Sequence, residues 1–235
     1  MGQIEKNYRN ILARIGAVAT AAGREPSSVK LVVVTKSHPV DAVREVVAAG
    51  AHCLGENYVE EALEKINAFG DQEIEWRMIG HVQSRKGRLV VENFAWCDSL
   101  DSLKLAKRLD RFAAETCVRL PVLLECNVSG EESKSGFTAW DENGWQALAD
   151  ELSAVVELPN LRIAGLMTMP PFFDEPERAR PYFRRLRRLQ GFLSKCFPDN
   201  DWKELSMGMS GDYKAAIQEG ATLVRIGTAI MGPRN

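Results

Sequence analysis

The sequence has little of what marks a membrane-spanning or secreted protein. No uninterrupted apolar stretch approaches the roughly 18 residues that a membrane span needs. The first segment, Met1 to Asn10, is too polar for the core of a signal peptide. These absences lead us to expect a cytoplasmic protein with no membrane partner.

Cysteine and histidine are also scarce, with five and three residues among 235. Because the histidines lack the short spacing typical of metal ligands, we expect no metal site. The odd number and wide spacing of the cysteines argue against a disulfide framework. We predict reduced thiols in the core for the whole set, which is Cys53, Cys97, Cys117, Cys126 and Cys196.

Neither sign of charge dominates, since 30 Lys and Arg residues stand against 32 Asp and Glu residues. A net charge of −2 gives no reason to expect nucleic acid as a partner. With 45% hydrophobic residues and no low-complexity linker, the chain can form one globular domain over residues 1–235. No exposed apolar stripe is evident, so we expect a monomer.

Several common catalytic motifs are missing as well. No G-x-G-x-x-G follows the first expected strand, and the sequence has neither a Walker loop nor an H-E-x-x-H motif. The segment Gly208–Gly211 misses the G-x-S-x-G pattern by one residue. The chemistry must therefore be found in another arrangement of residues.

What the sequence does contain is a regular alternation of short apolar runs and helical patterns. Apolar residues recur every three to four positions from Ile4 to Val18, which predicts an amphipathic helix. The strands expected after it are residues 31–35, 51–54, 76–79, 94–97, 122–126, 161–166, 204–207 and 223–226. This alternation predicts an α/β protein, a single (β/α)8 barrel with an extra N-terminal helix. An open, doubly wound sheet is the alternative.

Lys36 directly follows the first apolar strand, which would place its amine at the mouth of such a barrel. Partial desolvation there lowers the pKa of an amine, the condition for nucleophilic attack on an aldehyde. The alternative is an ordinary lysine at a strand end that points into water.

Two glycine- and hydroxyl-rich turns occur where barrels bind phosphate, after the last two strands. Leu205 to Asp212 carries Ser206 and Ser210 just before a helical pattern, and Gly227-Thr228 follows the last strand. Backbone N–H groups of both turns could converge on one anion, although such residues also form ordinary turns and helix caps. Together with Lys36 they indicate a covalently held, phosphorylated aldehyde.

Three polar residues near the strand ends have two interpretations each. Arg225 lies inside an apolar strand, where it could form a structural ion pair or contact a heterocycle nitrogen or phosphate. Asn57 could cap a helix or reach a cofactor ring. Glu56 is a candidate partner for a cation that faces the barrel mouth.

Two further features lie at the expected mouth. His81, after the third strand, is interpreted as a supporting residue in preference to an acid or a base. The polar loop Ser129 to Gly136, which carries Lys134, is either a mobile flap or a solvated surface loop.

Seven segments, taken in order, resemble those of the YggS/PROSC family, the pyridoxal phosphate homeostasis proteins, whose barrel is similar to the N-terminal domain of alanine racemase. The resemblance covers nearly the whole chain. The segments are Val33–Lys36, Gly55–Asn57, Ile79–Ser84, Ser133–Phe137, Gly165–Met169, Ser206–Ser210 and Val224–Thr228.

This resemblance implies a fold-type III barrel that binds pyridoxal 5′-phosphate (PLP). Lys36 would form the internal aldimine, Arg225 would lie near the pyridine nitrogen, and Asn57 would contact the ring. The residues implied around the phosphate are Ser206, Ser210, Gly227 and Thr228.

The residues are compatible with three functions. An arginine facing the ring nitrogen weakens the electron sink that a transaminase exploits, and the function we favour is a carrier that buffers PLP and delivers it to PLP-requiring apoenzymes. The first alternative is a small amino-acid racemase with Lys36 as its base, although none of the four tyrosines is a clear counterpart of the tyrosine that a racemase receives from its partner subunit. The second is a cofactor-free Schiff-base aldolase.

Overall fold

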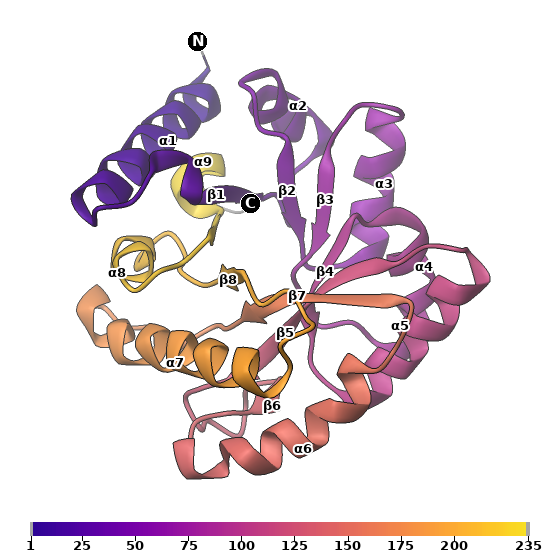
Figure 1. Cartoon of the computed structure of the whole chain (residues 1–235). Helices are drawn as coiled ribbons and strands as arrows, with labels where there is room; N and C mark the ends of the chain where they lie inside the picture. Colours follow the sequence, from indigo (N-terminus) through magenta and orange to yellow (C-terminus); the bar gives the residue numbers. More distant parts are fainter. Residues whose placement is uncertain (1, 234–235) are drawn as a thin grey trace.

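Nine parallel strands form one sheet in the computed structural model, which describes residues 2–233 (Figure 1). All of them except β6 pair in a closed ring, in which β1 joins β9 and β4 joins β5. The strands are β1 (Lys30–Val34), β2 (Cys53–Glu56), β3 (Glu75–Met78), β4 (Trp96–Leu100), β5 (Leu120–Asn127), β6 (Phe137–Thr138), β7 (Leu161–Met167), β8 (Glu204–Ser206) and β9 (Leu223–Ile226). The predicted (β/α)8 barrel is confirmed. Met1, Arg234 and Asn235 of the predicted domain lie outside the described residues.

Helices surround the ring of strands, as Figure 1 shows. They are α1 (Gln3–Ala21), α2 (Val40–Ala48), α3 (Val59–Phe69), α4 (Gly87–Asn93), α5 (Leu103–Glu115), α6 (Trp145–Val156), α7 (Arg180–Cys196), α8 (Tyr213–Gln218) and α9 (Thr228–Met231). The extra N-terminal helix α1 buries Tyr8, Ile11 and Ile15 on one face and is tied to α9 by a hydrogen bond from Asn7 Nδ2 to the carbonyl of Ile230, 3.0 Å long.

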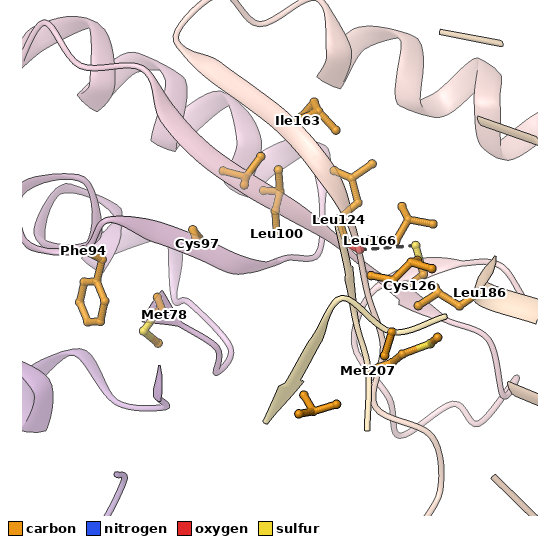
Figure 2. Packing of buried hydrophobic residues seen from close by; sticks show 14 of the residues in the cluster. Met78, Phe94, Cys97, Leu100, Leu124, Cys126, Ile163, Leu166, Leu186 and Met207 are labelled. Carbon is orange, nitrogen blue, oxygen red and sulfur yellow. Dashed lines mark hydrogen bonds between the residues drawn. The ribbon is translucent and has the colours of Figure 1, made fainter. Parts of the chain in front are cut away.

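The core lies between the strands and the helices (Figure 2). Leu124 of β5, Leu166 of β7 and Leu186 of α7 are fully buried there. The thiols of Cys97 and Cys126 lie among these apolar side chains, and burial raises the pKa of Cys97 to about 12. These are inert core thiols, as predicted.

The prediction of core thiols was wrong for Cys117 and Cys196, which are exposed. Cys117 follows the end of α5 and Cys196 is the last residue of α7. At a helix end successive side chains turn toward solvent, and the sequence pattern does not fix the residue at which the helix stops.

Several strand limits also differ from expectation. β2 begins at Cys53 and runs through Glu56, two residues later than predicted, and β4 runs from Trp96 to Leu100 where residues 94–97 were expected. The short strand β6 was not predicted at all; it pairs with the end of β5 outside the ring. Two residues are too few to display an alternating pattern.

Within residues 2–233, no helix is long and apolar enough to cross a membrane. The same part of the chain contains no group of three or more His, Cys, Asp or Glu side chains arranged to hold a metal ion.

Gly165 has no room for a side chain beside the backbone of the neighbouring strand. Its φ is +151°, and a Cβ atom there would lie 1.9 Å from the carbonyl oxygen of Glu204 in the neighbouring strand. Since neither backbone can move without disturbing β7–β8 pairing, Gly165→Ala is expected to lower the free energy of unfolding by about 2–3 kcal/mol. Urea denaturation measures it.

Gly191 supplies the matched control, because it lies inside helix α7 and no neighbouring atom lies within 4 Å of the position that a Cβ atom would occupy. Gly191→Ala is expected to stabilise the chain by up to about 1 kcal/mol. Equal effects of the two substitutions would contradict the close approach of β7 and β8 at Gly165.

Candidate functional site

A cavity of about 230 Å³ opens where the strands end at their carboxyl termini. Six of the seven residues predicted to bind a cofactor line it, although they come from distant parts of the sequence. They are Lys36, Asn57, Ser210, Arg225, Gly227 and Thr228. The fold therefore brings an amine, a guanidinium and a cluster of hydroxyls and glycines to one cavity.

Lys36 lies in the turn that follows β1 and is half-buried against the cavity. Thr35 before it is fully buried, whereas Ser37 after it is exposed and has a φ of +60°. The lysine stem thus emerges from the barrel wall at its mouth, as the sequence predicted.

Glu56 pairs with a cation, but this cation is Lys65, which is buried and does not line the cavity. Its carboxylate is fully buried and accepts hydrogen bonds from Thr35 Oγ1 at 2.6 Å and from Lys65 Nζ at 2.7 Å. Burial raises the pKa of Glu56, and the Lys65 ammonium opposes this effect. The partner comes from helix α3, which the position of Glu56 at a strand end does not reveal.

Arg225 is buried and is held by two neutral acceptors. Nη1 donates to Ser206 Oγ at 2.7 Å, and Nη2 donates to the carbonyl of Thr168 at 2.8 Å. Burial lowers the pKa of Arg225, while the nearby carboxylates, Asp98 foremost, counter that shift. A guanidinium offers only donors, so a ring nitrogen that meets it is kept as an acceptor.

Ser206 is the one predicted site residue outside the cavity lining. Its side chain is fully buried, and its hydroxyl serves as acceptor for Arg225. A phosphate contact by Ser206 stays a prediction, but its hydrogen bond with Arg225 makes it a support for the guanidinium.

The two turns expected to bind phosphate are joined to each other. Ser210 Oγ, in the turn after β8, accepts a hydrogen bond from the backbone N–H of Ala229 at the start of α9, 3.4 Å away. Asp212 closes the same turn by accepting from the N–H of Met209 at 2.6 Å. The small residues Gly211, Gly227 and Thr228 lie around this junction on the cavity wall.

Asn57 lines the cavity and does not cap a helix. The N-cap position of α3 is Tyr58, and no side-chain hydrogen bond caps that helix. Close packing holds the Asn57 backbone, since a Cβ atom on Gly80 would lie 2.4 Å from its carbonyl oxygen. Of the two interpretations of Asn57, the structure supports the position facing the cavity.

An apolar wall completes the cavity, and sequence reasoning missed it. Most of it comes from the segment after β7, where Met169, Phe172, Phe173 and Pro176 line the cavity. Phe173 is stacked on Tyr182 of α7, with ring centroids 5.8 Å apart. The run of proline and phenylalanine directly after a strand was the available signal.

A second, smaller cavity of about 160 Å³ adjoins the first, and Met169 lines both. It contains His81, Glu125 and Lys134. His81 is exposed, with Nδ1 2.7 Å from Asp101 Oδ2, which agrees with a supporting role. Whether the loop that carries Lys134 is mobile stays a prediction.

The carboxyl group of Glu125 is expected to make stability depend on pH. Burial, followed by the charge of Asp101, raises the pKa of Glu125 from 4.5 to about 7. Between these values the folded chain binds more protons than the unfolded chain, so stability falls as pH rises through that window. Glu125→Gln keeps the shape of the uncharged side chain and does not titrate. The free energy of unfolding of this variant, relative to that of the wild type, is therefore expected to rise by about 2–3 kcal/mol from pH 4.5 to pH 8.

Urea denaturation at both pH values measures this gain. Glu151→Gln, at an exposed position on α6, is the control and should leave the free energy of unfolding unchanged at both pH values. If wild type and Glu125→Gln showed the same pH dependence, Glu125 would not titrate in this window.

Comparisons with known proteins bear on this site. A sequence profile of the family described as alanine racemase, N-terminal domain, matches residues 3–235. The pyridoxal phosphate homeostasis protein of Pseudomonas aeruginosa is 45% identical over 235 residues, which cover 100% of this chain and 97% of that protein. Its counterpart from Vibrio alginolyticus is 42% identical over 240 residues, covering 100% and 99%. This chain belongs to the pyridoxal phosphate homeostasis protein family.

Solved structures also resemble this chain. PipY from Synechococcus elongatus PCC7942, solved with PLP bound, matches with a TM-score of 0.82 and 34% identity over 98% of this chain and 100% of that chain. An alanine racemase from Clostridium difficile has a TM-score of 0.70 at 16% identity, covering 96% of this chain and 56% of the racemase. The racemase shares the fold alone, whereas the family relationship predicted from the sequence is confirmed.

Proposed function

We propose that the chain binds PLP in the 230 Å³ cavity, with Lys36 Nζ as its covalent anchor, and serves intracellular PLP homeostasis. The observation that carries this proposal is the placement of Lys36, Arg225 and the hydroxyl–glycine junction around one cavity. Two similarities support it. The chain is 45% identical to a pyridoxal phosphate homeostasis protein over its full length, and it resembles a structure solved with PLP bound.

The residues fit PLP group by group. Lys36 supplies an amine for the aldehyde, and Arg225 supplies donors for the ring nitrogen. Ser210 and Thr228, with the adjoining glycines, supply hydroxyl and backbone groups for the phosphate. The apolar wall after β7 suits the faces of an aromatic ring.

The anchoring reaction is a reversible condensation. Lys36 would hold PLP through its side-chain nitrogen, which would form a C=N bond in place of the C=O bond and release one water molecule. Bound PLP supplies an electrophilic carbon and an electron-accepting ring. Asn57 would contact the ring region, and Ser206 would keep the Arg225 guanidinium oriented.

We further propose that the chain buffers PLP and delivers it to PLP-requiring apoenzymes without substantial catalytic turnover. The relatives are named as homeostasis proteins and not as enzymes. A donor-only guanidinium at the ring nitrogen would also disfavour ring protonation, which transaminases exploit. Residues 1–235 acting as one unit, a monomeric state and a cytoplasmic location belong to the same proposal; ultracentrifugation and cell fractionation test the last two.

Two assays test the proposal together. Titration of purified chain with PLP should produce a visible absorption band that borohydride removes, and the loaded chain should restore activity to a PLP-requiring apoenzyme. A colourless chain that takes up no PLP would overturn the proposal. Exchange of the α-proton of alanine at enzymatic rates would instead identify a racemase, the function that the shared fold makes the next candidate.

A further inference from the structure

A buried lysine lies directly behind Lys36. Lys65 of helix α3 has a side chain only 3% exposed. Its ammonium donates three hydrogen bonds, to the carbonyl of Thr35 at 2.7 Å, to Glu56 Oε1 at 2.7 Å and to Glu61 Oε1 at 2.6 Å. Lysine is seldom buried to this extent unless it is paired, and here every ammonium proton has an acceptor.

The same carboxylates hold both neighbours of Lys36 in the chain. Glu56 Oε1 also accepts from Thr35 Oγ1 at 2.6 Å, on the N-terminal side. Glu61 Oε1 also accepts from the backbone N–H of Ser37 at 2.5 Å, on the C-terminal side. Lys65 therefore links the residues that precede and follow Lys36 into one hydrogen-bonded network.

The backbone at Ser37 shows why such a network matters. Its φ of +60° lies in the left-handed region, which residues other than glycine seldom adopt. The strained turn needs surrounding interactions to persist, and the bond from Ser37 N–H to Glu61 is one of them. This turn also fixes the direction in which the Lys36 side chain leaves the barrel wall.

We propose that Lys65 and Glu61 are positioning residues for Lys36, fixing the peptide groups on both sides of it so that its amine points into the cavity. Neither residue lines that cavity, so both act through Lys36. The expected effect on PLP loading rests on the proposed function. The ordering of the turn at Lys36 does not depend on it.

Sequence alone does not reveal this role. Glu61 and Lys65 are four residues apart on a helix, a spacing typical of exposed ion pairs worth a few tenths of a kcal/mol. Only the packing of α3 against the strand ends buries Lys65 and brings the pair to the turn at Lys36.

The test uses two variants that open the network from different sides. Glu61→Ala removes the carboxylate that accepts the hydrogen bond from the N–H of Ser37. This carboxylate is partly exposed, so its removal leaves no large buried cavity. Lys65→Met alone would leave Glu56 as an unpaired buried carboxylate and destabilise the fold, so the second variant is Lys65→Met combined with Glu56→Gln. Glu64→Ala, at an exposed position on the same helix, is the matched control.

Hydrogen–deuterium exchange of the peptide that contains residues 35–38 gives a readout that needs no cofactor. We expect its exchange to accelerate about tenfold or more in both network variants and to stay unchanged in Glu64→Ala. Unchanged exchange in the network variants would overturn the inference, even if the chain failed to bind PLP.

The rate of PLP loading, followed by absorption well below the unfolding temperature, gives the second readout. We expect a fall of about tenfold or more in both network variants, since small misplacements of a reacting group are costly. Glu61→Gln, which keeps an acceptor oxygen, should recover most of the rate. If the wild type loads and the network variants load equally fast, the positioning role is wrong and the proposed function stands.

Discussion

Lys36→Ala is expected to abolish the visible PLP band and to raise the Kd for PLP by at least about 100-fold, or about 2.7 kcal/mol. The substitution removes the only covalent link in the proposal. Contacts of Ser210, Thr228 and Arg225 with the phosphate and ring would remain, so residual binding is reversible and is lost on gel filtration. Equilibrium dialysis with absorption detection measures the change.

Lys104→Ala is the control for this prediction, because Lys104 is an exposed lysine on α5 that does not line the cavity. It should keep the affinity and the spectrum of the wild type. Retention of a yellow, borohydride-sensitive species by the Lys36→Ala chain would contradict the assignment of the anchor.

Arg77→Met is expected to lower the free energy of unfolding by about 3–5 kcal/mol. Arg77 of β3 is buried; its Nε lies 3.0 Å from Asp98 Oδ2 and its Nη2 lies 2.8 Å from Asp98 Oδ1. Nη1 bonds to Glu75 at 2.7 Å, and the guanidinium lies 4.1 Å from the ring centroid of Trp96. Methionine keeps the apolar stem but leaves the fully buried Asp98 carboxylate without its main partner.

Two further variants separate this explanation from a general packing defect. Arg77→Met combined with Asp98→Asn removes both charges and should recover most of the loss. Arg111→Met breaks an exposed ion pair with Glu115 on α5 and should change stability by less than about 1 kcal/mol. Chemical denaturation measures all of them, and a loss below about 1 kcal/mol for Arg77→Met would contradict the buried pair.

The barrel could be predicted because each strand and helix leaves a local trace. Apolar runs such as Leu31–Val34 alternate with helical periodicity over the whole chain, and only a parallel sheet with helices outside accommodates that alternation. The positions of Lys36 and Arg225 at the cavity could be predicted for a similar reason. Burying a charge at the end of an apolar strand, or inside one, is costly without a partner, so a charged residue at such a position indicates a binding role or an ion pair.

The rest of the site depends on contacts between distant segments. Glu56 at a strand end gave no sign that its carboxylate would pair with Lys65 on the next helix. The hydrogen bond between Arg225 and Ser206 joins two strands that are 19 residues apart in the sequence, so only the closed barrel reveals it. Phe172 and Phe173 of the apolar wall belong to a loop, where neither helical nor strand periodicity predicts which side chains face a cavity.

The most direct test of the central claim is to locate the bond to PLP. The wild-type chain would be incubated with PLP, reduced with borohydride, digested, and mapped by peptide mass spectrometry. Anchoring by Lys36 predicts one phosphopyridoxyl group per chain, on the peptide that contains Lys36. Label spread over other lysines, with Lys36 unmodified, would contradict it.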